Sequence, residues 1–136
     1  MRIAIATTEF NYDITETMVQ RARAHAEFLG ATVPYIVRVP GVYDLPIAVK
    51  RLLARSDVDG VATIGVVIEG ETDHDDLVIQ HAARKIVDLS LEHDKPVGLG
   101  ITGPGMSRLQ AMSRVDRAKD AVEAIVKIGR ELQKLE

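Results

Sequence analysis

Cysteine and tryptophan are absent from this sequence of 136 residues, and only 4% of its residues are aromatic. The absence of cysteine excludes disulfide bonds, thiolate nucleophiles, and zinc or iron–sulfur sites with cysteine ligands. An excess of positive charge is also missing, since 17 basic residues stand against 20 acidic ones. A protein that covers nucleic acid needs such an excess, so we expect no nucleic-acid partner. The chemistry available to this chain therefore relies on histidine, acids, bases and backbone groups.

Long apolar runs are missing as well, and none approaches the ~18 to 20 residues that a membrane span needs. The first strand-like run reaches polar Thr7, Thr8 and Glu9 too early to supply the apolar core of a signal peptide. We therefore expect a soluble, cytoplasmic protein with no membrane partner. The length and the mixture of 46% hydrophobic and 27% charged residues predict one globular domain over residues 1–136.

Apolar runs rich in β-branched residues alternate with longer segments of helical periodicity, as in repeated strand–helix units around a parallel sheet. Strands are predicted at 2–7, 33–39, 61–68 and 96–102. Helices are predicted at 14–29, 45–55, 72–93 and 107–135. The inward stripe of the last helix is predicted to include Leu109, Met112, Ala118, Ile125, Ile128 and Leu132. The pattern predicts a doubly wound α/β fold with a four-stranded parallel sheet.

Ligands of open parallel sheets bind beyond the carboxyl ends of the strands. In this sequence those ends are the four joints at 8–13, 40–44, 69–75 and 103–108. Two of the few aromatic residues, Phe10 and Tyr43, lie in these joints and suit a flat ring ligand. The alternative is that both rings only pack over the end of the sheet. The fourth joint opens with Gly-Pro-Gly, which predicts a tight turn after the strand.

The joint after the third predicted strand contains His74, whose imidazole can exchange protons near neutral pH. The start of the next helix offers backbone N–H groups and the Thr72 hydroxyl, which can hold a phosphate. Three neighbouring aspartates oppose a second anion, so a phosphate there needs a basic residue from elsewhere. An ordinary solvated histidine is the alternative. His74 and His81 are two turns apart, which is too far to clamp one ion, so we expect no metal.

Four basic residues stand near the start of the last predicted helix: Arg108, Arg114, Arg117 and Lys119. A guanidinium can bind phosphate through two hydrogen bonds, so one of these arginines is enough to supply the missing positive charge. The alternative is a solvated face that pairs with nearby acids. The glycine-rich loops that bind nucleoside triphosphates and dinucleotides are absent from the sequence, so we expect neither as a cofactor.

Four segments together resemble the 6,7-dimethyl-8-ribityllumazine synthases of riboflavin biosynthesis, and look most like the archaeal branch. They are Glu-Phe-Asn at 9–11, Val-Pro-Gly-Val-Tyr-Asp-Leu-Pro at 39–46, the segment from Gly65 to His74, and Gly-Ile-Thr-Gly-Pro-Gly-Met at 100–106. The resemblance implies a flavodoxin-like three-layer α/β/α sandwich. It also implies a homopentamer, in some members twelve pentamers in an icosahedral shell, with active sites between neighbouring subunits.

The resemblance further implies two small-molecule substrates and no cofactor or metal. The pyrimidine, 5-amino-6-(ribitylamino)uracil, would lie against Phe10, Val42, Tyr43, Asp44, Val66, Val67 and Ile68, and against Leu99 of the adjoining subunit. The phosphate of 3,4-dihydroxy-2-butanone 4-phosphate would meet Glu71, Thr72 and the adjoining subunit's Arg114. His74 would transfer protons, and Asn11 and Lys119 are further candidates for the site.

Two positions depart from the family pattern. Asp44 stands where many members have Glu, which shortens a hydrogen-bonding reach. Leu99 stands where many have Phe, which removes a stacking face. We expect both differences to alter affinity more than the type of reaction.

Two other functions stay open at this point. The archaeal type of riboflavin synthase shares the Val-Pro-Gly stretch but lacks the Gly-Glu-Thr-x-His segment, so His74 speaks against it. A shell or carrier protein that binds a flavin or lumazine without catalysis would keep the ring-binding residues. Only an assay separates that protein from an enzyme.

Overall fold

One parallel sheet of four strands forms the centre of the computed structural model, which describes residues 1–70 and 73–136. The strands are β1 (Ile3–Thr8), β2 (Ile36–Val39), β3 (Gly60–Ile68) and β4 (Val97–Met106). Their order across the sheet is β2-β1-β3-β4, and every neighbouring pair is parallel. The four predicted strands are thus confirmed.

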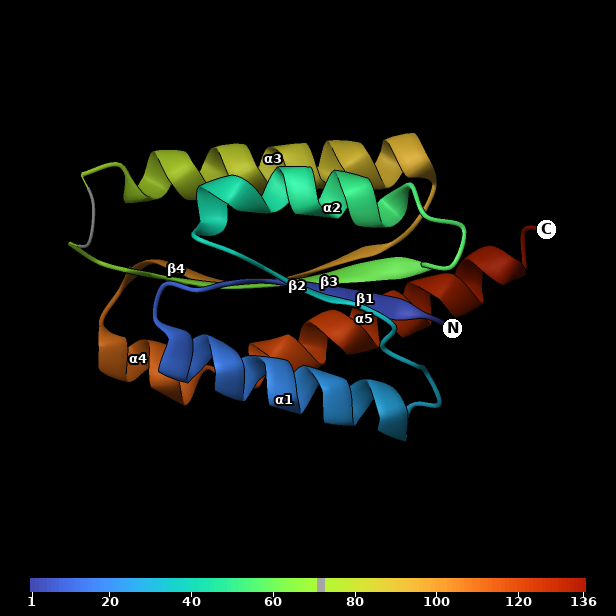
Figure 1. Cartoon of the computed structure of the whole chain (residues 1–136), viewed down its shortest axis with the longest axis horizontal. Helices are drawn as coiled ribbons and strands as arrows, with labels where there is room; N and C mark the ends of the chain where they lie inside the picture. Colours follow the sequence, from blue (N-terminus) through green and yellow to red (C-terminus); the bar gives the residue numbers. More distant parts are fainter. Residues whose placement is uncertain (71–72) are drawn as a thin grey trace.

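Helices cover both faces of this sheet (Figure 1). The helices α1 (Tyr12–Phe28), α4 (Arg108–Ser113) and α5 (Arg117–Gln133) lie on one face. The short 3-10 helix η1 (Val42–Asp44), α2 (Leu45–Leu53) and α3 (Asp75–His93) lie on the other. The predicted three-layer α/β/α sandwich is therefore confirmed. In the part of the chain that the structure describes, no helix combines the length and the apolar character needed to cross a membrane.

The two central strands of the sheet, β1 and β3, are buried on both faces because each face has its own hydrophobic core. Every residue of β1 and all of β3 except Ile68 are buried. Ile3 and Ile5 belong to the core beneath α1 and α5, whereas Ala4 and Ala6 belong to the core beneath α2 and α3. Full burial of an aliphatic side chain stabilises a fold by ~1.5–3 kcal/mol, so these two cores hold the strands in place. β3 is covered on both faces, as the nearly continuous apolar run of its sequence indicates.

The second strand begins at Ile36, three residues later than predicted. The Ile3 N–H donates to the Thr32 carbonyl and the Ile5 N–H to the Tyr35 carbonyl, each at 2.9 Å. A step of two residues on β1 is therefore matched by three residues on the neighbouring segment. The extra residue interrupts the ladder beside Pro34, which has no N–H to donate.

The predicted helix at 107–135 is wrong as a single helix, because the chain bends between α4 and α5. Tight turns replace helical bonds there: the Arg114 N–H donates to the Ala111 carbonyl and the Arg117 N–H to the Arg114 carbonyl, each at 3.1 Å. The predicted apolar stripe divides accordingly. Its members Ala118 and Ile125 are buried, and the following members are between 39% and 77% exposed: Leu109, Met112, Ile128 and Leu132.

The predicted turn after the fourth strand is also wrong, because β4 runs through Gly-Pro-Gly to Met106. Met106 pairs with Ile68, and the register between β3 and β4 shifts just before this pair. Gly103 has φ 114°, and a Cβ there would clash with the Val67 carbonyl. Glycine therefore lets the strand bulge against β3 and continue, where other residues would end the pairing.

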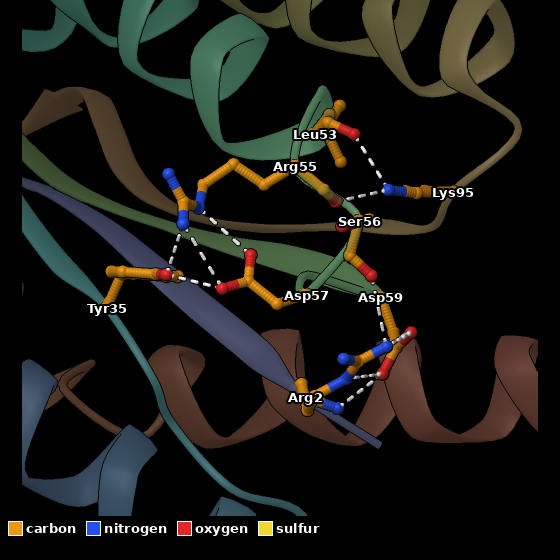
Figure 2. A network of polar contacts seen from close by, with 8 residues as sticks. All are labelled: Arg2, Tyr35, Leu53, Arg55, Ser56, Asp57, Asp59 and Lys95. Carbon is orange, nitrogen blue, oxygen red and sulfur yellow. Dashed lines mark hydrogen bonds and ion pairs between the residues drawn. The ribbon is translucent and has the colours of Figure 1, made fainter.

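A polar network closes the end of the sheet at which the strands begin (Figure 2). The Arg55 guanidinium donates to the Asp57 carboxylate at 2.9 Å and to the Tyr35 hydroxyl at 2.6 Å. The same hydroxyl donates to Asp57 at 2.5 Å. The Lys95 ammonium donates to the Leu53 and Arg55 carbonyls at 2.8 Å, at the end of α2. Hydrogen bonds from Arg55 and Tyr35 lower the pKa of Asp57 to about 2.

Candidate active site

The carboxyl ends of the strands meet at the edge of the sheet opposite both chain termini (Figure 1). Here the joints after β1 and β2 lie against each other. The Glu9 N–H donates to the Val39 carbonyl at 2.8 Å, and the Phe10 N–H donates to the Pro40 carbonyl at 3.1 Å. The Phe10 ring covers Gly41 so closely that a Cβ there would lie 3.0 Å from the ring. The two joints therefore form one continuous wall.

The two aromatic rings of this wall point outward. Phe10 is 62% exposed and Tyr43 is 73% exposed. Packing over the end of the sheet therefore leaves more than half of each residue exposed. Each ring offers a free face to a flat ligand or to a neighbouring chain.

The other predicted ring-binding residues differ in exposure. Val42, Val66 and Val67 are buried. Val42 packs against Gly65 so closely that a Cβ added to Gly65 would lie 2.8 Å from a methyl group of Val42. Leu99 is 56% exposed on the edge strand β4. Val66 also receives a hydrogen bond at its carbonyl from the Asn11 side-chain amide at 3.4 Å. The buried valines can therefore shape the site mainly through their backbone, whereas Leu99 presents its side chain.

Asp44 has a structural task within this wall. Its carboxylate accepts a hydrogen bond from the Gly41 N–H at 3.0 Å, which closes the turn that forms η1. Tyr43 lies inside that turn. Asp44 therefore holds the turn that presents the Tyr43 ring.

His74 stands at the N-cap of α3, and its carbonyl accepts from the Val78 N–H at 2.9 Å. A depression of about 460 Å³ lies beside it, bounded by the first turn of α3, by Glu69 at the end of β3, and by Pro104 and Gly105 of the β4 bulge. The helix begins at Asp75, later than predicted. The predicted phosphate-binding residues Glu71 and Thr72 lie outside the described residues.

Arg114 lies in the other helical layer, in the bend between α4 and α5, and is exposed. An ion pair of 2.7 Å between Arg21 of α1 and Asp116 ties this bend to α1. The hydrogen bond from Arg21 lowers the pKa of Asp116. Lys119 is half-buried at the start of α5. The helix that begins after His74, α3, and the two helices on either side of Arg114, α4 and α5, thus lie on opposite faces of the sheet (Figure 1).

One polar residue at this edge was not predicted as part of the site. The sequence places Arg108 among the basic residues of the last predicted helix, but in the structure it forms an ion pair with Asp13 and donates to the Asn11 side-chain oxygen at 3.4 Å. The partners are more than 90 positions away in the sequence, so no local spacing could have indicated this contact.

Comparison with known proteins identifies a protein family and several relatives that match this chain over nearly its whole length. The family model described as 6,7-dimethyl-8-ribityllumazine synthase matches residues 1–133. The protein of that name from Methanocaldococcus jannaschii is 60% identical over 136 residues, covering 100% of this chain and 96% of the relative. Those from Methanosarcina mazei and Methanothermobacter thermautotrophicus are 61% and 57% identical, covering 96% and 98% of this chain and 97% and 96% of the relatives.

A solved structure with low sequence identity to this chain also supports the fold. A flavodoxin from Streptococcus pneumoniae TIGR4 superposes with a TM-score of 0.50 at 11% identity, covering 91% of this chain and 99% of the flavodoxin. This similarity confirms the flavodoxin-like architecture and carries no information on activity. The family match, by contrast, spans nearly every residue, and the relatives agree along almost their whole length. The chain therefore belongs to the 6,7-dimethyl-8-ribityllumazine synthase family.

Proposed function

We propose that this chain is a transferase of riboflavin biosynthesis that joins 5-amino-6-(ribitylamino)uracil to 3,4-dihydroxy-2-butanone 4-phosphate. The products are 6,7-dimethyl-8-ribityllumazine, phosphate and water. The observation that carries the proposal is the family match over residues 1–133, together with relatives of that name at 57–61% identity. The reaction needs neither a redox cofactor nor a metal.

The pyrimidine is assigned to the wall formed by the joints after β1 and β2. The exposed rings of Phe10 and Tyr43 support this assignment, because an aromatic ligand gains from stacking on a free ring face. The backbone of Val66, Val67 and Ile68 would line the same ring and its ribityl chain. Leu99 of a neighbouring subunit would close the pocket from the other side, and its 56% exposure leaves it available.

The phosphate of the second substrate is assigned to the start of α3, with Glu71, Thr72 and the neighbouring subunit's Arg114. A helix start attracts anions through its backbone N–H groups. Asp75 and Asp76 in the first turn already complement that positive end, so a further anion needs a cation from outside. Within one chain, Arg114 lies in the helical layer on the other side of the sheet from α3. This supports the proposal that the arginine at each phosphate site comes from a neighbouring subunit. Lys119 is a second cation for the same role.

The reaction starts when the amine of the pyrimidine attacks the ketone carbon. Loss of water gives a Schiff base, phosphate then leaves, and ring closure with further loss of water gives the lumazine. His74 lies beside the depression and would move protons between these steps. Alignment of two bound substrates contributes up to ~7–11 kcal/mol in favourable cases, so positioning supplies most of the acceleration.

The assembly is assigned as a cytoplasmic homopentamer, which in some family members builds a shell. Exposed apolar side chains support a multi-chain assembly. Of the 19 residues of α3, only Ala82 and Ile86 are buried, whereas Leu77, Val87 and Leu91 are more than half exposed. Exposed apolar surface of this kind is typical of contacts between subunits.

One experiment tests activity and assembly together. The purified protein is mixed with both substrates, lumazine formation is followed by absorbance, and particle mass is measured by light scattering. We expect lumazine to form and the mass to correspond to at least a pentamer. A folded, assembled protein that forms no lumazine would overturn the enzymatic proposal, and retention of added lumazine would then identify a binding protein.

A further inference from the structure

Arg108 connects three strand ends at the edge that carries the candidate site. It is the first residue of α4, and only Ser107 separates it from the end of β4. Its guanidinium forms an ion pair with Asp13 in the first turn of α1 and donates to the Asn11 side-chain oxygen at 3.4 Å. The amide of the same Asn11 side chain donates to the Val66 carbonyl near the end of β3 at 3.4 Å. One arginine therefore links β4 to the β1 joint and, through Asn11, to β3.

Asn11 is a residue whose conformation needs support. It has φ 58° and ψ 46°, in the left-handed region, where residues other than glycine are uncommon. Its carbonyl accepts from the Ile14 and Thr15 N–H groups at 2.9 and 3.0 Å, so this conformation also begins α1. The residue directly before it is Phe10, whose ring covers Gly41. A shift at Asn11 would therefore move the Phe10 ring.

We propose that Arg108 is a positioning residue for the pyrimidine-binding wall. It acts through Asn11 and Asp13, and it keeps the Phe10 turn at a fixed place over β3 without touching the substrate. This inference rests on the proposed function, because it assigns the pyrimidine to Phe10. Arginine suits the task because its planar fork reaches a carboxylate and an amide oxygen together, which the single ammonium of lysine cannot do with the same geometry.

A purely stabilising role makes a different prediction. The side chains of Arg108 and Asp13 are 48% and 61% exposed, and exposed ion pairs contribute little to stability. Arg23 and Glu27 form another ion pair on α1, with side chains 50% and 62% exposed. Arg23→Gln is therefore a matched control: it removes the same charge at the same exposure, away from the strand ends. Loss of either arginine should change the unfolding temperature by a similarly small amount.

The experiment compares Arg108→Gln, Arg108→Lys and Arg23→Gln in the assembled enzyme, with each substrate varied separately. We expect Arg108→Gln to raise KM for the pyrimidine about tenfold, with kcat and KM for the phosphate substrate changed less than about twofold. Arg108→Lys should give an intermediate KM, and Arg23→Gln should behave like the wild type. Affinity for lumazine alone, titrated by its fluorescence, should fall in parallel with the pyrimidine KM.

Two further outcomes decide the inference. Asp13→Asn should raise the pyrimidine KM by a smaller factor, and adding it to Arg108→Gln should have little extra effect, because both changes break one link. Equal changes for both substrates, or for Arg108→Gln and Arg23→Gln, would overturn the inference while the proposed function stands. If the wild type forms no lumazine, the proposed function fails, and an unchanged lumazine affinity in Arg108→Gln would overturn the positioning role as well.

Discussion

His74 is the side chain to which proton transfer is assigned in the proposed reaction. His74→Ala should lower kcat by no more than the ~10²–10⁴-fold that general acid–base catalysis supplies, and should leave measurable turnover, because substrate alignment remains. His81→Ala, in the same helix, is the control for loss of an imidazole. Steady-state kinetics of both variants give the comparison. Complete loss of activity in a folded, assembled His74→Ala protein would contradict this division between alignment and proton transfer.

Arg114 is expected to act on one substrate only. Arg114→Ala should raise KM for the phosphate substrate about tenfold or more, because a charge-assisted pair of hydrogen bonds is lost, and should leave KM for the pyrimidine nearly unchanged. Arg117→Ala, three residues further on at the start of α5, controls for the loss of positive charge at the bend. Initial rates with each substrate varied in turn measure both constants. An equal rise in the two constants would count against the assignment.

Single residues differed in how far the sequence could indicate them. Phe10 and Tyr43 are two of the few aromatic residues in the chain, and their position in joints after strands was enough to predict them as ring-binding candidates. The structure shows that both are exposed. Arg108 could not be selected in this way. Its contacts to Asn11 and Asp13 exist only because the ends of β1 and β4 meet at one edge of the folded sheet.

Among the elements, strands were easier to predict than helix ends. A buried parallel strand requires a nearly continuous apolar run, and β3 shows one. No proline or glycine lies between α4 and α5, so no helix-breaking residue marks the bend in the sequence. The apolar residues of 107–135 keep helical periodicity through it. Gly103 and Gly105 are also turn residues by type, but pairing with β3 keeps this segment in the sheet as a bulge. Tertiary contacts decided both cases.

The loop between α2 and β3 allows a prediction on pH. Because the pKa of Asp57 is lowered to about 2 from the usual 3.8, the ionised carboxylate stabilises the folded state. This contribution is complete above pH 3.8 and is lost as the pH falls towards about 2. The urea midpoint of Asp57→Asn should therefore lie below that of the wild type at neutral pH, and the gap should close over this acidic interval.

Urea unfolding at a series of pH values measures that gap. Asp88→Asn, which removes a carboxylate from an exposed ion pair on α3, is the control for loss of negative charge. A gap between wild type and Asp57→Asn that stays constant down to about pH 2 would show that the carboxylate is not the stabilising group.

At the scale of the whole molecule, the proposal that each active site is shared between two chains can be tested directly. If His74 and Arg114 of different chains complete each site, oligomers that mix His74→Ala and Arg114→Ala chains should regain activity. Random mixing in equal amounts restores about a quarter of the sites, because both intact residues then meet at one interface. Activity of the mixed oligomers is compared with the mean of the two separate variants. No gain above that mean would place both residues in one chain's site.

The succession of strands and helices along the chain and the burial of β3 could be predicted from the residue pattern, because burial and local backbone preference act on neighbours in the chain. The family was identified by the resemblance of four short segments to its members, and the family match confirms it. The bend after α4, the bulge of β4 and the link from Arg108 to Asn11 arise between segments far apart in the sequence. They depend on which strand ends meet at the edge of the sheet and on how closely β4 approaches β3 and α5. Contacts of this kind form only when distant segments of the chain pack together, so a local sequence pattern cannot predict them.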